Sequence, residues 1–134
     1  MKDDSTAHDY SAFVRSKLQL ESQGGFAPSF MPDLLFDFQR FLVEWAVQKG
    51  RTAVLADCGL GKTPMQLVWA ENVVRHTNKP ALILTPLAVS SQTVREGAKF
   101  GIEAVKTSGE VGGAAVYVTN YEKLHHFNAS DFAG

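Results

Sequence analysis

Hydrophobic residues along this chain follow two patterns, helical spacing and short continuous runs. Helical spacing predicts four amphipathic helices, over residues 9–20, 34–49, 62–77 and 87–100. Short runs of apolar and β-branched residues predict four strands, over residues 52–55, 81–84, 104–107 and 114–118. Helices that alternate with buried strands are typical of an α/β protein with a parallel sheet. The helix over residues 9–20 precedes this unit as an accessory element.

The same spacing indicates which side chains form the core. In the helix over residues 34–49, one stripe is expected to face the interior, formed by Phe38, Phe41, Leu42 and Trp45. In the helix over residues 62–77, Met65 and Trp69 are expected to pack in the core rather than contact a ligand.

Candidate chemistry is concentrated between the first predicted strand and the helix that follows it, where residues 56–63 read ADCGLGKT. A strand, a glycine-bearing turn and Lys-Thr at the start of a helix form an arrangement that cradles nucleotide phosphates. Gly59 and Gly61 let backbone N–H groups approach phosphate oxygens, and the helix directs its positive dipole end at the same anion. Lys62 would contact the β and γ phosphates, and Thr63 would offer its hydroxyl to Mg²⁺. The residues expected to contact the nucleotide are Asp57, Cys58, Gly59, Leu60, Gly61, Lys62 and Thr63.

The loop departs from the usual GxxxxGK[ST] pattern, because Ala56 occupies its first position. In this form it resembles the Walker A motif of superfamily two helicases and Swi/Snf-type translocases, including those of phages and prophages. The alternative is a plain strand-turn-helix corner followed by Lys-Thr by chance. The coincidence of a strand before, a helix after and the complete GxGKT favours the phosphate loop.

Residues 35–39, which read LFDFQ, resemble a second segment of the same family. Gln39 lies 23 residues before Lys62, a spacing that the family shares. The resemblance implies that Gln39 and Phe36 contact adenine. A glutamine side chain has one acceptor and two donors, so it can pair with N7 and the N6 amino group of adenine. The alternative for Gln39 is a solvated helix residue.

Two further segments resemble nucleic-acid contacts of the family. Thr85-Pro86, after an apolar run, resembles motif Ia, and Thr119-Asn120-Tyr121 resembles a second loop at a strand end. The resemblance implies that these residues contact a nucleic-acid backbone, with double-stranded DNA as the expected partner. The residues themselves fit DNA and RNA equally. For the second segment the alternative is a helix cap at Thr119 or Asn120, and a capped helix N-terminus can also bind phosphate.

Composition limits the remaining possibilities. The net charge of −1 argues against a protein that holds nucleic acid by bulk electrostatics alone. A single cysteine excludes an intramolecular disulfide and fits a reducing compartment. No apolar run approaches a membrane span and the start lacks a signal peptide, so we expect a cytoplasmic protein without membrane contact. The four histidines do not have metal-ligand spacing, and no nucleophile motif occurs.

The resemblance implies a fold, a domain organisation and an activity. Residues 1–33 are expected to form the accessory helix and an irregular connector, which Phe26 and Phe30 anchor to the core. Residues 34–134 are expected to form an incomplete P-loop domain, a partial RecA-like parallel sheet with flanking helices. The implied activity is that of a nucleic-acid-dependent ATPase, a helicase or translocase, with ATP and Mg²⁺ as cofactors and Lys62 and Thr63 as catalytic residues.

One part of such an enzyme is missing from the sequence. The family needs a strand that ends in Asp-Glu, to hold Mg²⁺ and place the attacking water, and a second domain that supplies arginine fingers. No apolar run followed by Asp-Glu occurs in the 134 residues. The chain is therefore expected to be the N-terminal piece of a longer enzyme and inactive alone. The alternatives are another P-loop NTPase or small kinase, and a non-catalytic nucleotide-binding module.

Overall fold

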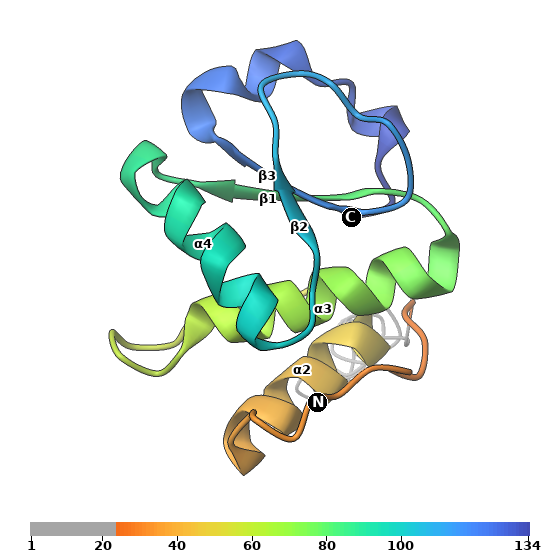
Figure 1. Cartoon of the computed structure of the whole chain (residues 1–134). Helices are drawn as coiled ribbons and strands as arrows, with labels where there is room; N and C mark the ends of the chain where they lie inside the picture. The colour runs from red at the N-terminus through yellow and green to blue at the C-terminus, as the bar shows by residue number, and fades with distance from the viewer. Residues whose placement is uncertain (1–23) are drawn as a thin grey trace, which may run out of the picture.

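The computed structural model describes residues 24–134 (Figure 1). The expected helix over residues 9–20 lies outside this range. The described chain contains α2 (Asp37–Lys49), α3 (Lys62–Thr77), β1 (Ala81–Thr85), α4 (Leu87–Lys99), β2 (Ala104–Lys106), β3 (Val116–Asn120) and two short 3-10 helices, η1 (Tyr121–His126) and η2 (Ala129–Asp131). None of the helices in residues 24–134 combines the length and the apolar character needed to cross a membrane.

The three strands form one parallel sheet in the order β1-β3-β2. Val116 of β3 is in register with Ala81 on one side and with Ala104 on the other. Because the strands are parallel, their carboxyl ends meet at one edge of the sheet. The predicted α/β class, a parallel sheet flanked by helices, is confirmed.

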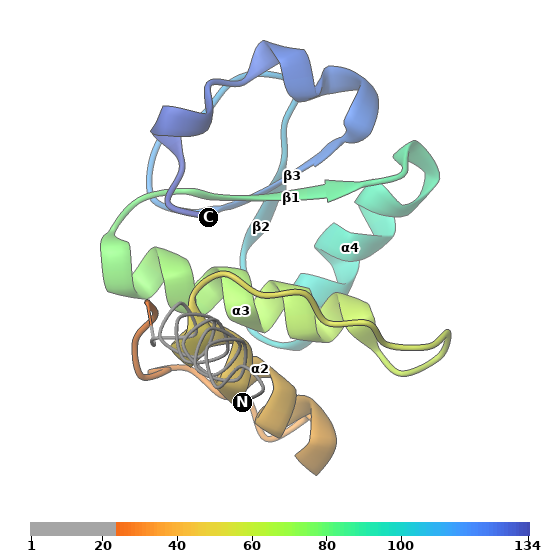
Figure 2. The ribbon, with the colours of Figure 1, turned by 180° about the vertical axis from the view of Figure 1, so that it is seen from behind.

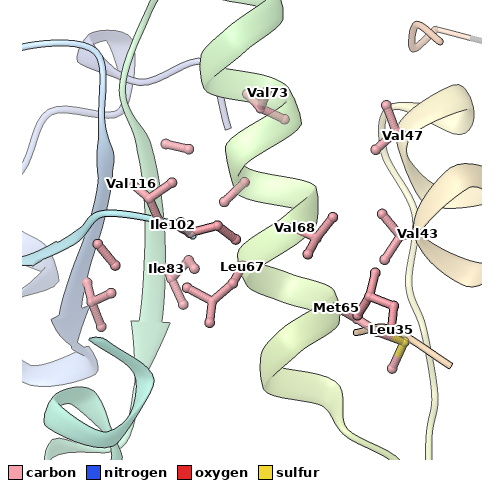
Figure 3. Packing of buried hydrophobic residues seen from close by; sticks show 14 residues of the cluster. Leu35, Val43, Val47, Met65, Leu67, Val68, Val73, Ile83, Ile102 and Val116 are labelled. Atoms are coloured by element: carbon pink, nitrogen blue, oxygen red, sulfur yellow. The ribbon is translucent and has the colours of Figure 1, made fainter. Parts of the chain in front are cut away.

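The helices form two layers beneath the sheet, with α3 between β1 and α2 (Figure 3). In Figure 3, Leu67 of α3 points toward Ile83 of β1, whereas Val68 points toward Val43 of α2. Leu67 and Val68 are fully buried. Each of these two α3 residues therefore fills a different interface, and α3 links the sheet to α2.

The connector before α2 is fixed to α3 by one side chain. Asn72, which is fully buried, accepts hydrogen bonds from the N–H groups of Ser29 and Phe30, both at 2.9 Å. Its amide nitrogen donates to the carbonyls of Phe30 and Val68, both at 2.8 Å. Phe26 and Phe30 also pack against the core, which confirms their predicted anchoring role.

The predicted apolar stripe of α2 is wrong for Phe38 and Phe41, whereas Leu42 is partly buried against the core, as predicted, and Trp45 is half-buried. The helix begins at Asp37 rather than near residue 34, and its Phe38 and Phe41 side chains are 44% and 67% exposed. The buried face is offset from the aromatic residues and consists of Gln39, Val43, Ala46 and Val47. This face of α2 packs against α3.

The predicted strand over residues 52–55 does not form. These residues have no strand partner, and Leu55 is 99% exposed. A β-strand needs a hydrogen-bonded neighbour, and no described strand lies beside this segment. The last strand is also displaced from its predicted position, because β3 spans Val116–Asn120 and its pairing with β1 continues to Asn120. Thr119 and Asn120 are therefore strand residues rather than loop residues.

Candidate nucleotide-binding site

The predicted phosphate loop, residues 56–63, enters α3 through two glycines in left-handed conformations. Gly59 has φ 78° and Gly61, the N-cap residue of α3, has φ 72°. Side chains with a Cβ are strained in this region of backbone space. The two glycines differ in their surroundings, because a Cβ at Gly61 would collide with the amide nitrogen of Gln39, whereas a Cβ at Gly59 would meet nothing within 4 Å.

Lys62 stands at the first position of α3 and folds back over the loop. Its Nζ donates to the Ala56 carbonyl at 3.1 Å, and the side chain is exposed. As in any helix, the first-turn N–H groups of Lys62 and Thr63 lack intrahelical acceptors. Within residues 24–134, the N-cap makes no side-chain hydrogen bond to them. The ammonium group and these N–H donors belong to one turn of chain, where the helix dipole also favours an anion.

Gln39 connects α2 to this loop. The side chain is 5% exposed, and its Oε1 accepts from the Phe36 N–H at 2.9 Å. Its Nε2 donates to the carbonyls of Leu60 at 3.2 Å and Gly61 at 3.3 Å. The acceptor and both donors of Gln39 are thus engaged within the chain. Gln39 thereby anchors the loop to α2. Sequence reasoning missed this contact, although the i, i+4 spacing of Gln39 and Val43 was a signal for a buried face.

The Phe36 and Asp57 side chains are both exposed. Phe36 precedes α2, is 69% exposed and stacks on Phe38, with ring centroids 6.2 Å apart. Its ring is therefore accessible to a flat ligand. Asp57 is exposed, and its carboxylate accepts from the Cys58 N–H at 2.8 Å, which shapes the turn. Cys58 is exposed as well.

Thr63, the predicted Mg²⁺ ligand, follows Lys62 in the first turn of α3 and is half-buried. In residues 24–134, no group of three or more His, Cys, Asp or Glu side chains could hold a metal ion.

The predicted nucleic-acid residues lie at the carboxyl edge of the sheet. Thr85 ends β1 and pairs in register with Asn120, which ends β3. Thr85, Thr119 and Asn120 are buried, whereas Pro86 and Tyr121 are exposed. Within residues 24–134, the Thr119 hydroxyl and the side-chain amide oxygen of Asn120 are buried and have no hydrogen-bond partner. Asn120 occupies the N-cap position of η1, but its side chain makes no capping hydrogen bond.

Gly61→Ala is expected to destabilise the fold more than Gly59→Ala does. Both substitutions place a Cβ at positive φ, which costs about 1–2 kcal/mol. Only Gly61→Ala also drives a Cβ into Gln39, so its loss in a urea unfolding titration should exceed that of Gly59→Ala. The double variant Gly61→Ala/Gln39→Ala removes the collision and serves as the control. Equal losses for the two single variants would contradict the close contact.

Comparison with known proteins adds no further constraint on the site. No protein-family model matches the chain, and no curated protein matches it either. The description of the site therefore rests on the structure alone. Its features are two left-handed glycines, a lysine at the first position of α3 and a buried glutamine that anchors the loop to α2.

Proposed function

We propose that this chain is the nucleotide-binding part of a nucleic-acid-dependent ATPase of the helicase and translocase type. The observation that carries the proposal is the position of Lys62. Its ammonium folds over a loop with two left-handed glycines at an uncapped helix N-terminus. This combination places a mobile positive charge beside free N–H donors, which suits a polyphosphate.

The residues present fit ATP and Mg²⁺ in named roles. Lys62 would exchange the Ala56 carbonyl for phosphate oxygens, and the N–H groups of Lys62 and Thr63 would bind the same anion. The Thr63 hydroxyl would be the protein ligand of Mg²⁺. Phe36 would stack on the base with its exposed ring. Bound Mg²⁺ would neutralise charge on the β and γ phosphates.

A nucleic-acid partner is supported by the relation between the loop and the sheet. Figures 1 and 2 show the phosphate loop and the carboxyl ends of β1 and β3 at the same end of the molecule. The exposed residues there include Pro86 and Tyr121. Tyr121 offers an aromatic face and a hydroxyl, which suit a base or a phosphate. Thr119 and Asn120 are proposed to act by positioning Tyr121, since they are buried and directly precede it in the chain.

Gln39→Ala tests the nucleotide role most sharply. We expect the substitution to weaken ATP binding by roughly 1–3 kcal/mol, because it removes hydrogen bonds and leaves their partners unpaired. If Gln39 also contacts adenine, the preference for ATP over GTP falls as well. Titrations of a fluorescent ATP analogue, with GTP as competitor, measure both quantities.

Inorganic tripolyphosphate provides the control for this titration, since it lacks a base. Loss of loop anchoring alone should weaken tripolyphosphate and ATP equally, whereas an adenine contact made by Gln39 in the bound state should make the loss larger for ATP. Equal losses for the two ligands would show that Gln39 holds the loop and makes no contribution to base recognition. Undetectable binding of ATP and tripolyphosphate to the unmodified chain would overturn the proposed function.

A further inference from the structure

The turn that follows β2 is fixed by the buried side chain of Thr107. Its backbone N–H donates to the Val118 carbonyl of β3 at 3.0 Å, and its hydroxyl donates to the Glu110 carbonyl at 2.5 Å. The same hydroxyl accepts a hydrogen bond from the Gly109 N–H at 3.3 Å. Ser108 lies between these bonded residues. It is exposed, but the turn gives it a defined position.

Two side chains of η1 converge on Ser108 from 15 and 18 residues away. The Lys123 Nζ donates to the Ser108 Oγ at 2.7 Å. The His126 Nδ1 lies 2.8 Å from the Ser108 carbonyl, and because a carbonyl only accepts, Nδ1 carries the proton. The His125 ring packs edge-on against His126, with centroids 4.1 Å apart. Figures 1 and 2 show η1 across the sheet from α3, so this cluster is separate from the phosphate loop.

The cluster keeps three hydrogen-bond donors for a ligand. The Lys123 ammonium retains two N–H groups, and the Ser108 hydroxyl retains its own proton because its oxygen accepts from Lys123. Since Nδ1 of His126 is bound to the turn, Nε2 is the free pole of the ring. Histidine takes up a proton close to neutral pH, and a bound anion favours its charged form. An anion at this point would therefore meet an ammonium, a hydroxyl and an imidazolium.

No carboxylate neutralises these groups within residues 24–134. Glu110 and Glu122 are close to them in sequence, but neither forms an ion pair with Lys123 or His126. Lys123 is held on a neutral serine hydroxyl instead. Its positive charge is thus left to attract an anion from outside the described chain.

We propose that Ser108, Lys123 and His126 form a binding site for a phosphate monoester. Such a group has three terminal oxygens and a charge of about −1.5 to −2, which matches three donors and two cationic side chains. A phosphodiester of a nucleic-acid backbone has two free oxygens and one negative charge, so it would leave a donor unused. The monoester belongs either to a small phosphorylated molecule or to the phosphorylated end of a strand. The inference does not depend on the proposed function.

The probe is inorganic phosphate, titrated into the 134-residue chain at about pH 6.5, where histidine titrates. Sodium chloride at the same ionic strength is the reference. The Lys62→Ala variant is the background, because it removes the phosphate loop as a competing anion site. NMR resonances report on each residue separately. We expect the Ser108 amide and the His126 ring resonances to shift and saturate, while those of α2 stay in place.

Substitutions in this background make the test specific. Lys123→Gln should lower phosphate affinity about tenfold, the equivalent of one charge-assisted hydrogen bond, and Lys123→Arg should retain most of the affinity. Lys106→Gln is the matched control, because the Lys106 Nζ is also held by a serine hydroxyl, that of Ser91 at 3.2 Å. It changes the net charge equally and should leave the affinity unchanged. His126→Asn keeps a donor for the Ser108 carbonyl but removes Nε2, and should weaken binding.

Three further ligands identify the source of the phosphate, namely ribose 5-phosphate and a thymidine tetranucleotide with and without a 5′-phosphate. The two phosphorylated ligands should shift the Ser108 and His126 resonances, and the one that binds more tightly assigns the source. The proposal would be overturned by no saturable shift with phosphate, by equal losses in Lys123→Gln and Lys106→Gln, or by equal shifts with the unphosphorylated tetranucleotide. ATP binding is measured separately on the unmodified chain, so failure of one proposal leaves the other standing.

Discussion

Lys62→Ala is expected to abolish measurable ATP binding while the fold stays intact. The ammonium group is the only side-chain cation in the GLGKT loop, and charge-assisted hydrogen bonds to phosphate are among the strongest in proteins. Its hydrogen bond to the Ala56 carbonyl is exposed and contributes little to stability. A fluorescent-ATP titration measures the loss, and a urea titration measures the free energy of unfolding.

Lys79→Ala provides the matched control for this substitution. Lys79 is also exposed, but it lies beyond the other end of α3 and away from the phosphate loop. The two variants change the net charge equally, so a difference in ATP affinity between them reports on position. Unchanged affinity in Lys62→Ala would remove the phosphate-loop assignment.

The 134-residue chain is expected to bind ATP without hydrolysing it at an enzymatic rate, with or without DNA. Binding needs the loop and Lys62, whereas hydrolysis also needs carboxylates that hold Mg²⁺ and place water. An arginine finger alone contributes about 10³- to 10⁵-fold in rate. The sequence contains no apolar run followed by Asp-Glu.

Phosphate release, followed with saturating single-stranded and double-stranded DNA, measures this turnover. Lys62→Ala supplies the background, because it should not bind ATP. DNA-stimulated release near 1 s⁻¹, a typical enzyme rate, would show that a catalytic carboxylate lies elsewhere in the chain. Asp57 is then the first residue to replace, since its carboxylate stands in the loop itself.

Elements with strong local signals could be predicted from the sequence. The bounds of α3 agree with its apolar spacing, and Asn78 ends it in a left-handed conformation, as a C-cap residue does. The strand at 81–84 was recognised because a continuous apolar run between turn signals fits a buried parallel strand. These features depend on residues within a few positions of one another.

Features that depend on distant neighbours could not be predicted in the same way. Residues 52–55 have the composition of a strand, but pairing needs another strand beside them. The buried face of α2 is set by its contact with α3, which selects Val43 and Val47 rather than the larger Phe38 and Phe41. The candidate site shows the same division between local signals and contacts that depend on distant residues. The loop glycines and Lys62 could be read from a motif, whereas the bonds from Gln39 to Leu60 and Gly61 span more than twenty residues.

The four hydrogen bonds of Asn72 set a limit on where this chain can be shortened or cleaved. They use the full capacity of the amide, and three of them reach Ser29 and Phe30 in the connector. A version that begins at residue 34 would leave most of a fully buried amide unsatisfied in the middle of α3, at a cost of about 1–3 kcal/mol for each unpaired group. Residues 24–33 therefore belong to the same cooperative unit as the helix that carries Lys62. A protease that cuts in the connector is expected to destabilise the predicted phosphate loop.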